Sequence, residues 1–225
     1  MLHDVNNPLR GLEAKALAGR PLSEAELAEV VAVATEDPSL AFPGATRLRR
    51  SRFGNRVSFC SIVPGKVGGC GEDCPWCAQS RRARNGSQKP ERTDLKTILQ
   101  AADAAGDWGS SFLSIVNSGA GPSTADLEAA CEAARAVAAR NGRRRIGLCC
   151  SLGRIDETQA PRLAEAGFRR YHHNLETSED HFARLVSTHA YRERLATLQA
   201  ARAAGMEICS GGLFGMGESP ADRVA

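Results

Sequence analysis

A repeated succession of helix, glycine and strand between residues 94 and 215 constrains the fold of this chain more than any other feature. Strands are predicted at residues 57–63, 111–117, 145–152, 168–175 and 206–215. A predicted helix precedes each of the last four strands, with a polar residue at its start and a glycine at its end. Strands that alternate with helices of about 10–15 residues indicate βαβ units and a parallel sheet.

This pattern predicts an α/β fold, in the form of a partial (β/α)8 barrel of the TIM type with about five strands. A complete barrel of this kind needs about 250 residues, and the first strand here begins near Arg56. We therefore expect residues 56–225 to form a barrel that is incomplete at its C-terminus, as the first part of a longer one. Ser219 and Pro220 are expected to begin one more helix, as a cap residue and a proline at the first helical position.

Residues 1–55 are expected to form an N-terminal helical extension. Ser23 and Glu26 have the spacing of a capping box, and residues 24–37 then follow a helical periodicity. Pro38 and Pro43 are expected to close this segment.

Charge and hydropathy exclude several classes of protein. The chain has 29 Lys and Arg against 26 Asp and Glu, a net charge of +3, which gives no support to nucleic-acid binding. No apolar run approaches the roughly 18 residues of a membrane span, and no secretory signal is visible at the start. A cytoplasmic location without membrane partners is expected, where cysteines stay reduced.

Three of the eight cysteines are crowded into one short segment. Cys70, Cys74 and Cys77 form a C-x3-C-x2-C motif in a glycine-rich loop that directly follows the first strand. Iron–sulfur clusters of the [4Fe–4S] type usually take four Cys, so three thiolates leave one iron open to a small molecule. Glycines let the backbone wrap closely around such an inorganic group.

Two other interpretations of these cysteines remain open. A structural zinc site needs four ligands, and Cys60 or a distant His would have to complete it. Reduced cysteines packed in a core are the second, although a glycine-rich loop is a poor place to bury them. Elsewhere in the chain, Cys131 and Cys150 are expected in the core, and Cys60 is expected to be a packed strand residue.

The C-x3-C-x-aromatic-C motif after the first barrel strand resembles the signature of the radical S-adenosylmethionine (radical SAM) superfamily. Further motifs are similar to those of one family within it, the biotin synthases. They are CSIVPGKVGGCGEDCPWCAQS, SIVNSGAGPS, CCSLG, YHHNLETS, THAYRERLATL and CSGGLFGMGE, and they follow one another between residues 57 and 218.

This resemblance implies a reaction and its cofactor. A [4Fe–4S] cluster on Cys70, Cys74 and Cys77 would bind S-adenosylmethionine and cleave it to methionine and a 5′-deoxyadenosyl radical. That radical would take hydrogen from dethiobiotin, and insertion of sulfur would give biotin. The resemblance also implies a reducing electron-transfer protein, such as flavodoxin or ferredoxin, and a homodimer.

The resemblance also assigns residues to S-adenosylmethionine and to the substrate. Trp76 would lie beside the adenine, and Asn174 and Glu176 would hydrogen-bond the ribose. His172 would face the ureido ring of dethiobiotin. Because side chains alternate along a strand, residues 172, 174 and 176 are expected on one face, with His173 turned away as a packing or surface residue.

An auxiliary [2Fe–2S] cluster, the sulfur donor of the family, is implied by the same resemblance. Cys149 and Cys209 match two of its ligand positions, and Ser114 stands where the third cysteine is expected. The fourth ligand of the family, an arginine on a later strand, would lie beyond Ala225. A neutral serine is a poor iron ligand beside a thiolate, so the composition of this cluster is in question.

Two alternative functions therefore stay open. One is another radical SAM reaction of the same subgroup with a modified auxiliary cluster. The other is a metal-binding fragment without catalysis. His3, His181 and His189 have no context that indicates a role.

Overall fold

The structure, a computed structural model, describes residues 7–83, 89–140 and 146–225. The chain forms two compact units. Residues 58–213 form the larger unit, and residues 1–57 form the smaller one together with residues 214–225. The predicted domain bounds of 1–55 and 56–225 stay a prediction. Across the described residues, no helix combines the length and the apolar character that a membrane crossing requires.

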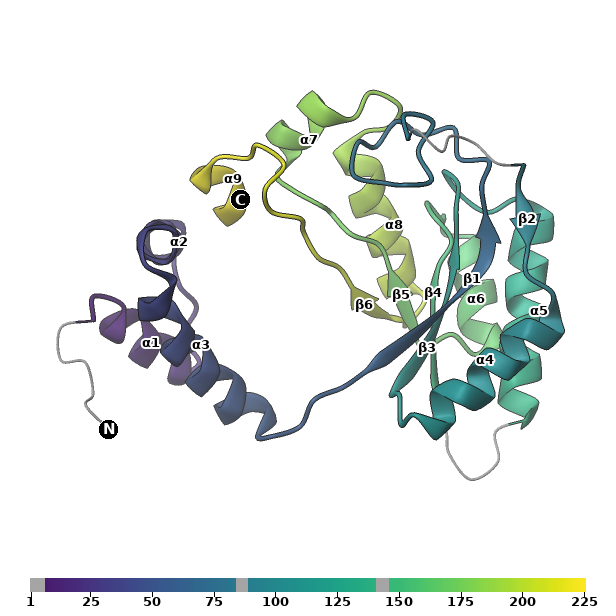
Figure 1. The fold of residues 1–225 in the computed structure, drawn as a ribbon, viewed down its shortest axis with the longest axis horizontal. Coiled ribbons are helices and arrows are strands. Elements are labelled where there is room, and N and C mark those ends of the chain that lie inside the picture. Colours follow the sequence, from purple (N-terminus) through teal and green to yellow (C-terminus); the bar gives the residue numbers. More distant parts are fainter. Residues whose placement is uncertain (1–6, 84–88, 141–145) are drawn as a thin grey trace. The chain divides into compact units, whose positions relative to one another are not determined.

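One sheet organises the larger unit (Figure 1). Its strands in the described residues are β1 (Cys60–Val67), β2 (Glu91–Arg92), β3 (Phe112–Asn117), β4 (Gly147–Ser151), β5 (Arg170–His172) and β6 (Glu207–Cys209). The sheet order is β2-β1-β3-β4-β5-β6, and every neighbouring pair is parallel except β1 with β2. Apart from β2, chain order and sheet order agree, as in a (β/α)8 barrel and unlike a doubly wound sheet. The predicted α/β fold with five parallel strands is confirmed.

Helices cover one face of this sheet (Figure 1). They are α4 (Leu95–Asp107), α5 (Thr124–Arg140), α6 (Gln159–Ala166) and α8 (Tyr191–Ala203), and the short α7 (Glu179–Leu185) follows β5. The core between sheet and helices includes Leu113, Ile115 and Tyr171, each at most 1% exposed. Cys131 and Cys150 lie in the same core, fully buried, as predicted.

The opposite face of β1 is exposed, which corrects one prediction. Val63 turns towards the helices and is buried, whereas Ile62 is 70% exposed on the other face. Cys60 is two residues before Ile62, so it shares that face, and its thiol is exposed. The prediction that Cys60 packs as a strand residue is wrong, because its thiol lies on the face of β1 opposite to the helices of the larger unit.

Two predicted strands are shorter than expected, and β2 was not predicted at all. β5 ends at His172 and β6 at Cys209, and beyond them only Glu176 and Gly212 form an isolated bridge. Glu176 has a φ of 71°, in the left-handed region. The expected strand alternation therefore does not extend from His172 to Asn174 and Glu176. β2 has two polar residues and no apolar alternation that a sequence pattern detects.

Local capping signals set two helix ends as predicted, whereas Gly106, expected to end the helix that begins at Asp94, lies inside α4, which ends at Asp107. Asp94 accepts a hydrogen bond from the backbone N–H of Thr97 at 2.8 Å, at the start of α4. Gly167 ends α6 in the left-handed conformation, with a φ of 113°.

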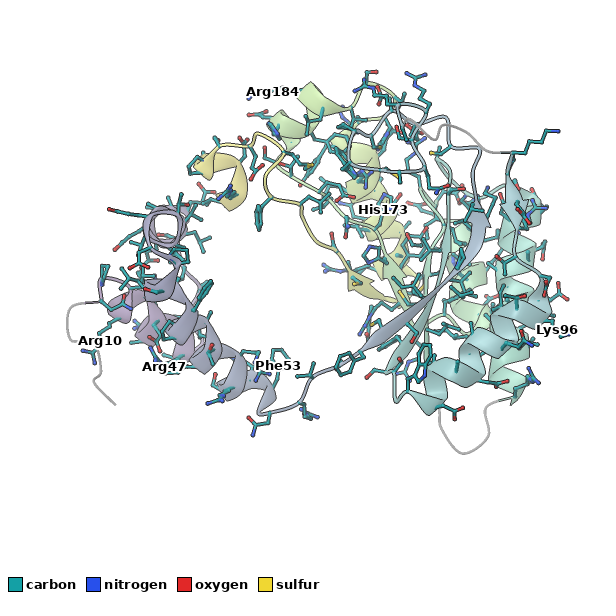
Figure 2. All side chains as sticks on the ribbon, viewed as in Figure 1. Arg10, Arg47, Phe53, Lys96, His173 and Arg184 are labelled. Atoms are coloured by element: carbon teal, nitrogen blue, oxygen red, sulfur yellow. The ribbon has the colours of Figure 1, made fainter. Side chains whose placement is uncertain are left out.

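The smaller unit consists of helices in its described residues: α1 (Arg10–Leu17), α2 (Glu24–Glu36), α3 (Pro38–Phe53) and α9 (Pro220–Val224). The predicted capping box of Ser23 and Glu26 begins α2. Pro43 does not close the segment as expected, because α3 continues through it to Phe53. Pro38 begins that helix at a position whose N–H would have no helical partner. Arg47 of α3, labelled in Figure 2, forms an ion pair with Glu13 of α1.

Candidate functional site

The three clustered cysteines lie in a loop that leaves the C-terminal end of β1. Gly68 and Gly69 open this loop with φ angles of 77° and 66°, which L side chains rarely adopt. Cys70 and Cys74 are buried, and Cys77 is half-buried. Burial raises the pKa of the Cys74 thiol to about 11, so without a cationic partner this group stays protonated at neutral pH.

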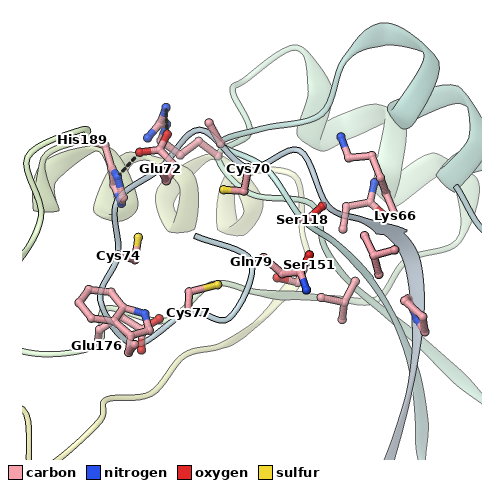
Figure 3. Close-up of a pocket in the computed structure, with 18 of the residues that line it drawn as sticks. Lys66, Cys70, Glu72, Cys74, Cys77, Gln79, Ser118, Ser151, Glu176 and His189 are labelled. Atoms are coloured by element: carbon pink, nitrogen blue, oxygen red, sulfur yellow. Dashed lines mark hydrogen bonds and ion pairs between the residues drawn. The ribbon is translucent and has the colours of Figure 1, made fainter. Parts of the chain in front are cut away.

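The loop forms the wall of a pocket of about 370 Å³ (Figure 3). The three cysteines surround one common space in this pocket, and Trp76 lines it with them. Residues at the ends of β1, β3 and β4 and in the segment before α8 line the same pocket. The C-terminal ends of barrel strands are where active sites of this architecture lie.

Asp73 ties the cysteine loop to the segment between α7 and α8. Its carboxylate is fully buried and accepts hydrogen bonds from the backbone N–H of Ser187 at 3.1 Å and from the Ser187 hydroxyl at 2.6 Å. Thr188 Oγ1 at 3.0 Å and Arg82 Nη2 at 2.6 Å donate as well. The Ser187 hydroxyl is the largest cause that holds the pKa of Asp73 far below its usual range. These hydrogen bonds join the loop to the segment between α7 and α8.

A second connection joins Glu72 of the loop to Arg194 of α8 through His189. His189 Nδ1 lies 2.8 Å from Glu72 Oε2 (Figure 3). Arg194 Nε donates to His189 Nε2 at 3.2 Å. Because a guanidinium only donates, Nε2 accepts, and Nδ1 carries the proton towards Glu72. Burial lowers the pKa of His189, which fits this neutral ring. His189 therefore does have a context, contrary to the sequence prediction, whereas His3 lies outside the described residues.

Two of the residues predicted to contact S-adenosylmethionine, Trp76 and Glu176, line this pocket. Its side chain is buried, and among the described residues its Oε2 atom has no hydrogen-bond partner. Burial raises the pKa of Glu176. Arg194 Nη1 lies 3.6 Å from Glu176 Oε1 and donates to the Asn174 carbonyl at 2.6 Å. A buried acceptor oxygen and a fixed guanidinium in one pocket suit a polar ligand with hydroxyl and carboxylate groups.

Four other predicted residues lie outside this pocket, on the face of the sheet opposite to α4, α5, α6 and α8, whereas Asn174 lies beyond the end of β5. Ser114 of β3 pairs in register with Cys149 of β4, and His172 of β5 pairs with Cys209 of β6. His172 Nδ1 is 3.3 Å from Cys209 Sγ. Burial raises the pKa of the Cys149 thiol to about 11. His173 turns the other way and is buried, and burial lowers its pKa to about 3, as for a packed neutral ring.

The donor set of the loop fits an iron–sulfur cluster better than a single ion. Among the residues that the structure describes, no three His, Cys, Asp or Glu side chains converge closely enough to hold one metal ion, as a structural zinc site requires. A cluster distributes its thiolates over several irons. Cys70, Cys74 and Cys77 line one pocket together, so this loop could supply three such thiolates.

Sequence reasoning missed several residues of this pocket. Glu72, Arg154, His189 and Arg194 all line it. His189 and Arg194 belong to the THAYRERLATL motif, so the sequence drew attention to this segment. The motif did not predict that the two side chains contact each other or Glu72.

The sequence matches the profile described as Radical SAM superfamily over residues 66–225. It is 39% identical to the biotin synthase of Trichlorobacter lovleyi over 220 residues, which are 97% of this chain and 65% of that protein. It is 43% identical to that of Nitratidesulfovibrio vulgaris over 180 residues, 80% of this chain and 49% of that protein. The chain thus spans about half to two thirds of the length of the curated relatives it matches. The predicted resemblance is confirmed.

Solved structures agree on the fold. Methylornithine synthase superposes with a TM-score of 0.80 at 18% identity, over 95% of this chain and 62% of that one. HydG, a maturase of the [FeFe]-hydrogenase, superposes with a TM-score of 0.79 at 16% identity, over 95% of this chain and 48% of that one. At these identities the likeness concerns the fold alone.

Proposed function

This chain belongs to the radical SAM superfamily, and from that premise we propose that it acts as a biotin synthase. The reaction is the conversion of dethiobiotin to biotin by insertion of sulfur, with S-adenosylmethionine and a reductant. Similarity to biotin synthases from several bacteria, at 38–43% identity, supports this choice among the reactions of the superfamily. The observation that carries it is the convergence of Cys70, Cys74 and Cys77 on one pocket.

These three thiols are the ligands of a [4Fe–4S] cluster in this proposal. When bound, the cluster supplies the electron that cleaves the sulfonium of S-adenosylmethionine. The raised pKa of Cys74 supports the need for a strong cationic partner, since only the thiolate ligates iron. Asp73 and Glu72 hold the loop in place from inside the motif, so the protein loses little conformational entropy when the cluster binds.

The pocket walls hold S-adenosylmethionine against this loop. Trp76 offers an aromatic face for the adenine, and the unpartnered Oε2 of Glu176 accepts from a ribose hydroxyl. The Arg194 guanidinium suits the carboxylate of the methionine part. Asn174 contributes through its hydrogen bond to Glu176 and through its carbonyl, which receives Arg194.

Anaerobic reconstitution tests this function directly. The chain with iron, sulfide, reductant, S-adenosylmethionine and dethiobiotin is expected to release 5′-deoxyadenosine and biotin. Cys74→Ala is expected to lose the iron of the loop cluster and both products. Cys131→Ala is the matched control, because it removes a thiol from the helical core and is expected to keep them. Equal product yields from the two variants would refute the assignment of the loop.

Ser114 favours a second candidate, another radical SAM reaction at the same pocket. A hydroxyl at this position changes the ligands available to the auxiliary cluster that donates sulfur. Release of 5′-deoxyadenosine without biotin, in the presence of dethiobiotin, would select this candidate. Iron binding without 5′-deoxyadenosine would select a metal-binding fragment instead.

A further inference from the structure

The cysteine loop continues directly into two exposed arginines. The Ser80 N–H donates to the Cys77 carbonyl at 3.0 Å, so the chain turns immediately after the third cysteine. The Arg81 N–H then donates to the Glu72 carbonyl at 3.0 Å, which folds this segment back against the loop. The side chains of Arg81 and Arg82 are 56% and 50% exposed. Two guanidiniums therefore lie at the surface beside the loop that carries the thiols.

A third arginine reaches this part of the surface from α7. Leu185, the last residue of α7, belongs to the same small apolar cluster as Cys74, so the end of this helix packs on the cysteine loop. Arg184, labelled in Figure 2, precedes Leu185 and is exposed. Arg82 Nη1 donates to the Leu185 carbonyl at 3.3 Å, which joins the two segments next to Arg184. We call Arg81, Arg82 and Arg184 the arginine surface.

The arginine surface keeps a net positive charge. Asp73 Oδ2 accepts from Arg82 at 2.6 Å and lies 3.9 Å from Arg81 Nη2, so this carboxylate offsets one of the three charges. Asp73 is fully buried and does not itself face solvent. The acidic residues of α7 stand in its first turn, whereas Arg184 stands in its last turn. A positive surface of this kind attracts an acidic partner and raises the rate of encounter.

The proposed function requires a partner at a surface close to the thiols. A cluster that gives an electron to S-adenosylmethionine must receive another before it can react again. Complexes for electron transfer are small and weak, with interfaces below about 1,200 Å², so they need no large apolar face. Complementary charges steer such encounters.

We propose that the arginine surface is the docking site of an acidic electron-transfer protein that reduces the loop cluster. The redox cofactor of the partner gives up one electron, which the oxidised cluster accepts, and no bond or proton is exchanged. Arg81 and Arg82 extend from the loop itself, and Arg184 extends from the helix packed on it, so a partner held there lies next to the cluster ligands. The proposal rests on the proposed function, because that function calls for a reductant.

Binding of oxidised flavodoxin, an acidic electron-transfer protein, to the reconstituted chain tests this surface by biolayer interferometry. Arg184→Glu is expected to weaken the affinity about tenfold at low salt, because it places a carboxylate opposite an acidic partner. Arg81→Glu is a second variant with the same expected direction. The affinity of the unaltered chain is expected to fall as the salt concentration rises.

Arg202→Glu is the matched control for these variants. It makes the same change of charge at an exposed arginine in the last turn of α8, the end of that helix away from the segment that contacts the loop. Its affinity for flavodoxin is expected to equal that of the unaltered chain. Circular dichroism melts of all variants check that the fold is kept.

The choice of reductant separates docking from chemistry at the pocket. With limiting reduced flavodoxin, Arg184→Glu is expected to release 5′-deoxyadenosine about tenfold more slowly than the unaltered chain. With dithionite, a small reductant that needs no docking surface, the two rates are expected to be equal.

Several results would overturn the proposal. They are no binding of flavodoxin to the unaltered chain, equal affinities of Arg184→Glu and Arg202→Glu, an affinity that does not change with salt, and an RNA oligomer that binds as tightly as flavodoxin. Slower release by Arg184→Glu with dithionite would also overturn it, because the residue would then act on the pocket itself. If the unaltered chain releases no 5′-deoxyadenosine with dithionite, the proposed function fails, and the binding measurements still decide whether the arginine surface docks flavodoxin.

Discussion

Replacing Asp73 with alanine is expected to detach the cysteine loop from the segment between α7 and α8. Asp73 is the fully buried acceptor of four hydrogen bonds, from the Ser187 backbone and hydroxyl, Thr188 and Arg82. In Asp73→Ala these donors lose their acceptor while the Arg82 charge stays in place. Cys74 follows directly in the chain, so the loop that carries the thiols is expected to lose its fixed position.

The size of the effect follows from burial. Leaving a buried donor without its acceptor costs about 1–3 kcal/mol, and the donors of Ser187 and Thr188 all lose theirs, whereas Arg82 is 50% exposed and stays hydrated. Even one such loss is a large fraction of the roughly 5–15 kcal/mol that stabilises a typical domain. Asp103→Ala is the matched control, because Asp103 is 62% exposed and its Oδ2 lies 3.7 Å from Arg140 Nη1. An exposed pair of this kind contributes about 0–1 kcal/mol.

Urea unfolding of the iron-free chain, followed by circular dichroism, measures both free energies. Asp73→Ala is expected to lower the free energy of unfolding several-fold more than Asp103→Ala, and to bind less iron in the loop after reconstitution. If the two variants differ from the unaltered chain by the same amount, or if Asp73→Ala keeps full iron content, then the buried carboxylate does not position the loop.

Three further substitutions test the structure elsewhere. Asp126→Asn is expected to cost about 3–5 kcal/mol in urea unfolding at neutral pH. Although burial acts to raise it, hydrogen bonds from Lys66 and Arg92 hold the pKa of Asp126 far below its usual range. A lowered pKa stabilises the fold above the unfolded pKa of about 3.9, so the difference between the two proteins is expected to shrink as the pH falls below that value and to stay constant above it. Tyr171→Phe leaves the part-buried carbonyl of Gly153 and the buried N–H of Leu152 without their phenol partner, and it is expected to lose about 1–3 kcal/mol in the same assay. An unchanged free energy of unfolding would contradict these hydrogen bonds. His189→Ala is expected to weaken S-adenosylmethionine binding about tenfold in equilibrium dialysis, the equivalent of one hydrogen bond to a charged group, and unchanged affinity would refute its positioning role.

The corrections share a physical cause. Periodicity identified Cys60 as a strand residue, but it could not tell which face of β1 a helix covers. Periodicity also extended the strand alternation of β5 to Asn174 and Glu176. No sequence pattern near Glu176 predicts that its backbone adopts the left-handed conformation.

The amino-acid sequence by itself determined the succession of strands and helices, the caps that end the helices, and the loop with three cysteines. These features arise from interactions within a few residues, such as the hydrogen bond between Asp94 and Thr97. Only the tertiary structure decided which groups meet in the pocket. Asp73 and Ser187 are 114 residues apart, and Glu72 and His189 are 117 apart. No local pattern encodes such pairs, because the parallel sheet brings the ends of distant strands to the same edge.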